Sequence, residues 1–195
     1  MTERAGEAFW RFSLAFYGRP GVSEALLALQ DRGGADVNLI LYALWLGLSG
    51  RGALERGGLD AAEPVARLLR EAAVDPLREL RRRLKGTPDG DVALLRERVK
   101  GLELDAERIV QRRLAALAPP PAAAAPRGER IAAAEAGLAL CLGPALAASG
   151  EAAVLRRAAA AWPFAGPPPL SRNAGEGAER SEAGEGIAAR SSGRK

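Results

Sequence analysis

The chain has 195 residues, of which 48% are hydrophobic and 27% charged, enough for one domain with its own core. Its net charge is +4 with a pI near 9.8, but 28 basic residues are interspersed with 24 acidic ones, so charge alone does not indicate a nucleic-acid partner. There is no histidine and only one cysteine, Cys141, which excludes catalytic triads with a histidine base, histidine-containing zinc sites and an internal disulfide.

The N-terminal segment and the longest apolar run of the chain indicate where the protein resides. The N-terminal segment carries acidic residues early and has no continuous apolar stretch, so it does not resemble a signal peptide. The longest strongly apolar run, residues 37–48, is well short of the ~20 residues that cross a bilayer. We therefore expect a soluble, cytoplasmic protein with no membrane span and no cofactor.

The N-terminal quarter predicts three helices that carry the large side chains of a core. Seven of the nine aromatic residues lie between Phe9 and Trp45, and those in residues 7–17 recur at helical spacing. A second helix is expected over residues 22–32, ended by a glycine pair. The third, residues 37–48, is apolar on all sides and should be the buried centre of a bundle.

Residues 60–117 predict a long antiparallel helical hairpin. The capping-box pattern Asp60-Ala-Ala-Glu63 is expected to open its first helix, with Pro64 in the first turn and a kink at Asp75-Pro76. After a turn at residues 86–90, a second helix runs from 91 to 117. Its apolar residues alternate by three and four in a seam suited to packing on the first helix, namely Val92, Leu95, Val99, Leu102, Ala106 and Ile109.

The remainder of the chain changes composition twice. Residues 118–128 form a Pro/Ala linker, and residues 129–162 predict an Ala-rich helical pair, packed on the core and interrupted at Gly143-Pro144. Residues 163–195 are of low complexity and are expected to be a disordered tail. The predicted fold is therefore all-α: residues 1–117 form a core domain, with a compact three-helix core and a long hairpin, and the Ala-rich pair follows.

A polar turn between the second and third helices is the first candidate site. Asp31, Asp36 and Asn38 supply oxygen atoms of the kind that Mg²⁺ or Ca²⁺ prefers, or could position a substrate. Each residue also has a structural explanation: Asp36 stands where the third helix needs an N-cap, Asn38 lies in its first turn, and Asp31 precedes the glycine pair. We interpret the turn as helix caps, with an enzyme that uses these carboxylates as an alternative.

A basic stripe on the first hairpin helix is the second candidate. At 100° per residue, four cations gather in one arc beside Leu77, Leu80 and Leu84, and they are Arg78, Arg81, Arg82 and Lys85. Such a stripe could bind a polyanion, an acidic partner or an acidic lipid surface. It could equally be a solvated face, and no aromatic residue is interleaved for base stacking. We therefore keep polyanion binding through these four residues as an alternative function.

A pair of glutamates on the second hairpin helix is the third candidate. Glu103 and Glu107 lie one turn apart, as carboxylates do in di-metal helical bundles. Those bundles also use histidine, which this chain lacks, so we expect no metal site. No nucleotide-binding glycine motif is present, and no catalytic or cofactor-binding residue is assigned.

Several short segments together resemble a known family, and they are residues 9–14 (FWRFSL), 19–22 (RPGV), 29–31 (LQD), 36–39 (DVNL) and 76–78 (PLR). With Trp45, they are similar to an uncharacterised family of short proteobacterial proteins catalogued as domain of unknown function 2390. The resemblance covers residues 7–117 and implies a helical domain without implying an activity. Our first hypothesis is a non-catalytic helical module for protein interaction or regulation, because a long amphipathic hairpin occurs without a catalytic constellation.

Overall fold

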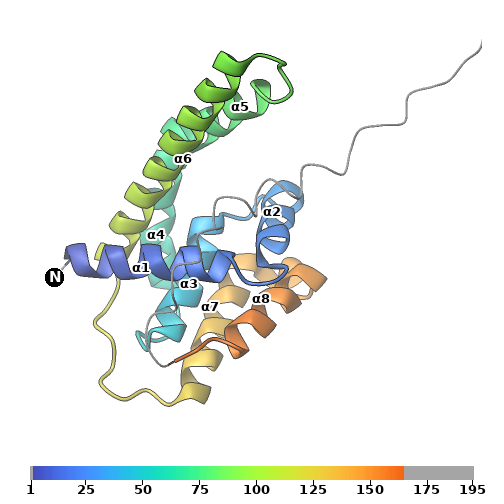
Figure 1. The fold of residues 1–195 in the computed structure, drawn as a ribbon. Coiled ribbons are helices and arrows are strands. Elements are labelled where there is room, and N and C mark those ends of the chain that lie inside the picture. The colour runs from blue at the N-terminus through green and yellow to red at the C-terminus, as the bar shows by residue number, and fades with distance from the viewer. Residues whose placement is uncertain (1, 165–195) are drawn as a thin grey trace, which may run out of the picture.

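The computed structural model describes residues 2–164, and every regular element in this range is a helix (Figure 1). The prediction of an all-α fold is confirmed. The elements in chain order are α1 (Thr2–Tyr17), α2 (Val22–Gly33), α3 (Val37–Leu48), α4 (Arg56–Leu69), the π-helical segment η1 (Arg70–Val74), α5 (Asp75–Arg83), α6 (Gly90–Ala116), α7 (Arg127–Ala147) and α8 (Gly150–Ala160). Apart from residues 163 and 164, the predicted tail lies outside the described residues.

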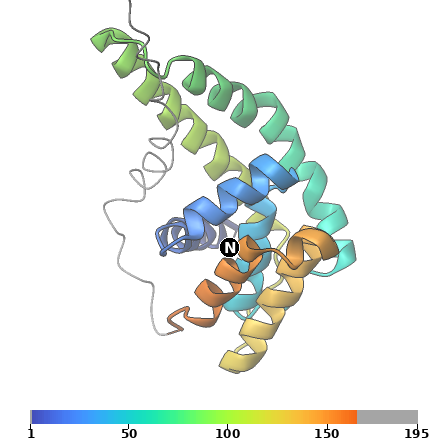
Figure 2. The same cartoon turned by 90° about the vertical axis from the view of Figure 1, so that its right-hand side faces the viewer.

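The chain forms a helical body from which a hairpin projects. α4, η1 and α5 run antiparallel to α6, and the end of the hairpin that joins α5 to α6 extends away from the other helices (Figures 1 and 2). α1 packs on α6 and α2 packs on α8, so segments distant in sequence close the body. The hairpin therefore has a base packed within the fold and a tip exposed to solvent.

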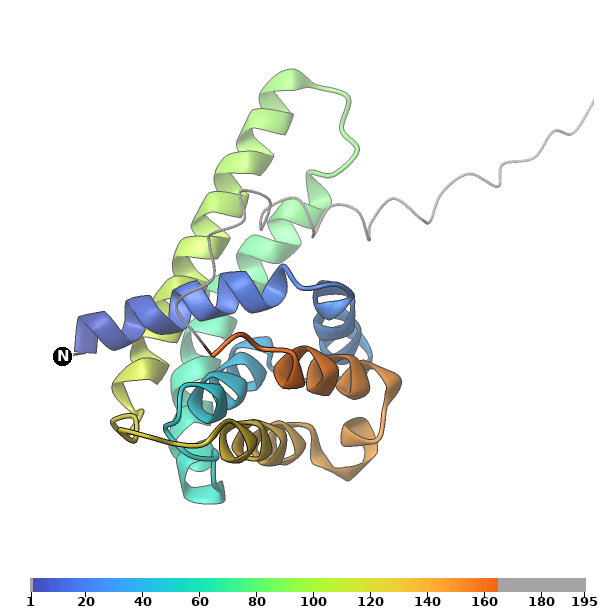
Figure 3. The same cartoon turned by 60° about the horizontal axis from the view of Figure 1, so that its bottom comes forward.

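α3 is the centre of the body, as its sequence predicts. Every residue from Leu39 to Leu48 is buried. α7 lies along α3 so closely that a β-carbon added at Gly47 would lie 2.2 Å from the backbone nitrogen of Ala134 (Figure 3). Phe9 of α1 stacks on Trp45 of α3 with ring centroids 4.9 Å apart. The core thus joins the aromatic N-terminal helices to the Ala-rich helix α7.

α4 begins earlier than the sequence predicts. The expected capping box at Asp60 is wrong: α4 starts at Arg56, its N-cap residue Glu55 makes no side-chain capping bond, and Asp60 lies inside the helix. Pro64 is consequently internal to the helix and not in its first turn. The physical reason is burial, because a helix that includes Leu59 places that side chain in the core, where it is 4% exposed. Apolar packing outweighs the local capping preference here.

The predicted kink at Asp75-Pro76 takes a specific form. The five residues of η1, Arg70–Val74, are π-helical and come directly before Asp75. Pro76 is the second residue of α5, and its ring removes one backbone N–H donor directly after the π-helical segment. The π-helical segment therefore separates α4 from α5 without ending the hairpin arm.

α7 contains the predicted break at residue 143. Gly143 has φ +66° and ψ 172°, outside the helical region, and Pro144 follows it. In the described part of the chain, α7 is the helix that is long and apolar enough to cross a membrane by length and composition. In this structure its residues Ala134, Gly137, Leu138 and Leu142 are buried.

Candidate functional site

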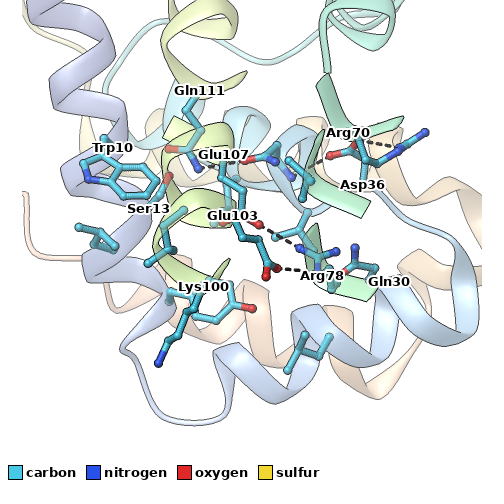
Figure 4. A pocket seen from close by; sticks show the side chains of 18 of the residues that line it. Trp10, Ser13, Gln30, Asp36, Arg70, Arg78, Lys100, Glu103, Glu107 and Gln111 are labelled. Carbon is cyan, nitrogen blue, oxygen red and sulfur yellow. Dashed lines mark hydrogen bonds and ion pairs between the residues drawn. The ribbon is translucent and has the colours of Figure 1, made fainter. Parts of the chain in front are cut away.

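A pocket lies where the hairpin meets the body (Figure 4). It has a volume of about 160 Å³ and is lined by α1, α2, the start of α3, the α4–α5 arm and α6. Trp10, Leu14 and Tyr17 of α1 supply an apolar wall with two aromatic rings. The other elements supply the charged side chains of the lining, together with further apolar residues such as Leu41 and Val74.

Arg78 of α5 is held between two carboxylates of α6. Its Nε donates to Glu103 Oε1 at 2.9 Å, and its Nη2 donates to Glu107 Oε1 at 2.9 Å. Arg81 Nε donates to the second oxygen of Glu103, Oε2, at 2.8 Å. The Glu103 side chain is only 8% exposed, and both of its oxygens are satisfied by guanidinium donors. Buried charges of this kind are tolerated because they are paired.

Two pKa values in this cluster are shifted by its surroundings. Burial raises the pKa of Glu107 to about 7, outweighing the attraction of Arg78, and repulsion from Glu103 adds to the increase. For Arg78, burial acts to lower the pKa, but the attraction of Glu107 and Glu103 prevails and the net shift is upward. Glu107 can therefore exchange a proton near neutral pH.

Asp36 uses both carboxylate oxygens inside the protein. Oδ1 accepts from the backbone N–H groups of Asn38 and Leu39, at 2.9 and 3.3 Å, which is the N-cap that the sequence predicts for α3. Oδ2 accepts from Arg70 Nη1 at 2.7 Å. Asp36 is therefore a capping and ion-pairing residue, with both carboxylate oxygens bonded to donors of the protein.

The structure splits the predicted polar turn. Asp36 and Asn38 line the pocket, whereas Asp31 is 57% exposed and pairs loosely with Arg82, at 3.6 Å. Asn38 Oδ1 accepts from Gln111 Nε2 of α6 at 3.0 Å, tying the start of α3 to the hairpin. Asp31 does not belong to the same site.

The basic stripe is also split. Arg78 and Arg81 are 15% and 17% exposed and point into the pocket, so describing all four cations as one solvated face is wrong for these two. Arg82 is 56% exposed, and neither it nor Lys85, which follows α5, lines the pocket. The carboxylates that recruit Arg78 and Arg81 are those of the third candidate, Glu103 and Glu107. Three separate sequence candidates thus contribute to one pocket.

The sequence analysis did not single out several pocket residues as site candidates, among them Trp10, Ser13, Arg70 and Gln111. Ser13 could have been noticed from the sequence, because it is a polar residue within an otherwise aromatic helical face, whereas Gln111 follows the charged residues Glu107 and Arg108 and gives no such signal. Both are buried, at 4% and 3% exposure. Within residues 2–164, no group of three or more His, Cys, Asp or Glu side chains is placed to hold a metal ion.

A second feature lies on the projecting end of α6. The predicted seam does not close over its whole length. Val99 and Ala106 are buried, but Leu95 and Leu102, which belong to the same seam, are 46% and 56% exposed. They are seven residues apart on a continuous helix and so lie on one face. We call Leu95 and Leu102 the exposed leucine face.

A family model described as "Protein of unknown function (DUF2390)" matches residues 8–114. The chain belongs to this family. The matched range spans every residue that lines the pocket, from Trp10 to Gln111, and stops before α7 and α8. No curated protein and no solved structure matches the chain. The pocket and the exposed leucine face both lie within the part of the chain that defines the family.

Proposed function

We propose that this protein is a non-catalytic interaction module whose projecting hairpin binds a helix of a partner protein through the exposed leucine face. The observation that carries the proposal is the exposure of Leu95 and Leu102, at 46% and 56%. Leucines repeated every seven residues on a straight helix match the spacing by which two helices pack side by side. A partner helix would remove both side chains from water.

The ion-pair cluster supports this function by fixing the position of the face. No residue of α5 is buried, so apolar packing alone gives α5 little hold on α6. The bonds from Arg78 and Arg81 to Glu103 fasten α5 to α6 at the level of Leu102. A face that is fixed before binding loses less conformational entropy on association.

The alternative functions have less support. Polyanion binding through the stripe would require Arg78 and Arg81 to leave buried carboxylates, and only Arg82 and Lys85 stand outside the pocket. An enzyme based on the polar turn would require a carboxylate facing open space, whereas Asp36 is bound to backbone N–H groups and Arg70. Polyanion binding becomes an outcome of the experiment that tests the proposal.

The test compares the proteins captured from a lysate of the source cell by wild type and by three variants of the full chain. Leu95→Gln/Leu102→Gln disrupts the exposed leucine face. Leu68→Gln/Leu117→Gln is the matched control, because these leucines are 60% and 45% exposed but lie outside the projecting end. Arg82→Gln/Lys85→Gln tests the cations outside the pocket.

We expect a protein captured by wild type to be lost with the leucine-face variant and retained with the other two. Nucleic acid that elutes with salt and is lost only with Arg82→Gln/Lys85→Gln would instead favour polyanion binding. A capture profile that is the same for all variants would contradict the proposal.

A further inference from the structure

A row of charged residues runs along α6 beside the exposed leucine face. Its members recur every seven residues, are exposed to solvent and alternate in sign. In order they are Asp91, Arg98, Asp105 and Arg112. Leu95 and Leu102 each lie three positions before a member of this row, so the two rows are neighbours on the helix surface. One side of α6 therefore combines an apolar row with a row of alternating charges.

The two central charges of this row have no partner within the described chain. Arg98 and Asp105 are seven residues apart, which is about 10 Å along the helix axis and beyond the spacing at which side chains of one helix pair. Within residues 2–164, neither side chain forms a hydrogen bond or an ion pair. Both charges are therefore available to a second helix that packs on the exposed leucine face.

The order of the charges identifies that second helix. A second copy of α6 that runs antiparallel, centred between Arg98 and Asp105, places Arg98 beside Asp105 of that copy. The same alignment places Asp91 beside Arg112 of that copy. A parallel copy in the same register would instead place like charges together, which opposes association. The charged row is therefore complementary to itself when the two copies run antiparallel.

The apolar row fits the same arrangement. With the same centre, Leu102 lies beside Leu102 of the second copy, and Leu95 comes within one residue of the half-buried Ile109 of that copy. Removal of these side chains from water supplies most of the driving force, because exposed ion pairs contribute little free energy. The charges act mainly on orientation and partner choice.

The shape of the protein leaves room for this pairing. The hairpin projects from the helical body, and its base is at the body end of α6 (Figures 1 and 2). In an antiparallel pair, the two bodies lie at opposite ends of the paired helices. Because both copies use the same surface, the association closes at two copies and does not propagate into a fibre.

We infer that the exposed leucine face, together with Arg98 and Asp105, is the interface of a homodimer in which the α6 helices of two copies pack antiparallel. This inference rests on the proposed function, because it uses the same face and identifies the partner helix as α6 of a second copy. The hairpin then carries both recognition elements: the leucines for affinity and the charges for direction.

The first experiment measures the mass of the purified full chain by sedimentation equilibrium over about 1 to 500 µM. We expect a monomer–dimer equilibrium with a Kd of about 1 to 100 µM, because only a few side chains of each copy leave water, so the chain is monomeric below about 1 µM. Leu95→Gln/Leu102→Gln should weaken the dimer at least tenfold. The matched control Leu68→Gln/Leu117→Gln, outside this face, should associate as wild type does.

The second experiment exchanges the two central charges. Arg98→Asp alone, or Asp105→Arg alone, places like charges opposite each other across the interface, and each variant should dimerise at least tenfold more weakly than wild type. An equimolar mixture of the two single variants should associate again, because each negative charge of one then meets a positive charge of the other. Recovery in the mixture also shows that both variants are folded.

Three results would overturn the inference. A chain that stays monomeric at every concentration has no such dimer; the proposed function would then depend on the lysate experiment alone, where a different protein can still be lost with the leucine-face variant. A dimer that persists in Leu95→Gln/Leu102→Gln would have its interface elsewhere. A mixture of the single charge variants that does not associate would contradict the antiparallel pairing of Arg98 with Asp105.

Discussion

Arg70 and Asp36 form one ion pair that joins the π-helical segment to the start of the central helix. Arg70 Nη1 lies 2.7 Å from Asp36 Oδ2, while Oδ1 of the same carboxylate caps α3. One aspartate therefore fixes both the N-terminus of α3 and the position of η1. Both residues line the pocket, so the pair also sets the shape of one of its walls.

Asp36→Ala should destabilise the protein by about 2 to 4 kcal/mol, because it removes an N-cap and leaves Arg70 without its buried partner. Asp89→Ala is the matched control, since Asp89 caps α6 through the same two kinds of backbone bond, to Asp91 N and Val92 N, but at an exposed position. The control should cost only about 1 kcal/mol in urea-induced unfolding. Equal losses for the two variants would show that Arg70 adds nothing to the cap.

Glu107 should make stability depend on pH. Burial raises its pKa from 4.5 to about 7, so between these values the folded protein holds a proton that the unfolded chain has lost. Stability therefore falls as the pH rises from about 4.5 through 7, by roughly 1 to 3 kcal/mol, and the loss is complete above that range. Urea unfolding at a series of pH values should show this fall in wild type.

Glu107→Gln removes the titrating group while keeping an oxygen acceptor for Arg78, so its stability should fall less over the same pH range. Glu97→Gln, at a 56% exposed position of α6, controls for the loss of one negative charge. Parallel pH profiles for wild type and Glu107→Gln would contradict the shift.

The helices were predictable because their signals are local. The aromatic and apolar spacing of residues 7–48 contains both the periodicity and the glycine stops of α1, α2 and α3, and Asp36 is the cap that the sequence indicates. The start of α4 was not predictable in this way. The burial of Leu59 depends on its position against the rest of the fold and overrides the capping pattern at Asp60.

The pocket could not be assembled from the sequence, although most of its charged residues were noticed. Arg78 and Glu103 are separated by 25 positions in the sequence. A basic residue on an amphipathic helix gives the same sequence pattern whether its side chain faces water or a buried carboxylate. Only the antiparallel register of α5 and α6 decides between the two. That register depends on η1 as well as on the turn, and the π-helical geometry of η1 has no sharp local signature.

Two leucines on α6 should respond very differently to truncation. Leu114 is fully buried, and Leu114→Ala should cost about 2 to 5 kcal/mol through lost burial and a cavity. Leu102 is 56% exposed, and Leu102→Ala should change stability by less than about 0.5 kcal/mol. Thermal and urea unfolding of both variants provide the measurement. A large loss for Leu102→Ala would mean that this side chain already packs within the fold, and the exposed leucine face would lose its basis.

Gly47 should be the least replaceable glycine of the body. A β-carbon there would lie 2.2 Å from the backbone nitrogen of Ala134 and 2.4 Å from its Cα, and backbone atoms cannot turn aside as a flexible side chain can. Gly47→Ala must therefore push α7 away from α3, and we expect a loss of about 3 kcal/mol or more in the free energy of unfolding.

Gly101→Ala provides the control for Gly47→Ala. Gly101 lies within α6, and a β-carbon added there would meet no neighbouring atom within 4 Å, so alanine should stabilise the helix by about 0.5 to 1 kcal/mol. The opposite signs of the two glycine substitutions, measured by urea unfolding, test how α7 is placed. If Gly47→Ala were as harmless as Gly101→Ala, α7 would not lie against α3. Its length and apolar character would then need another explanation than packing in the core of the bundle.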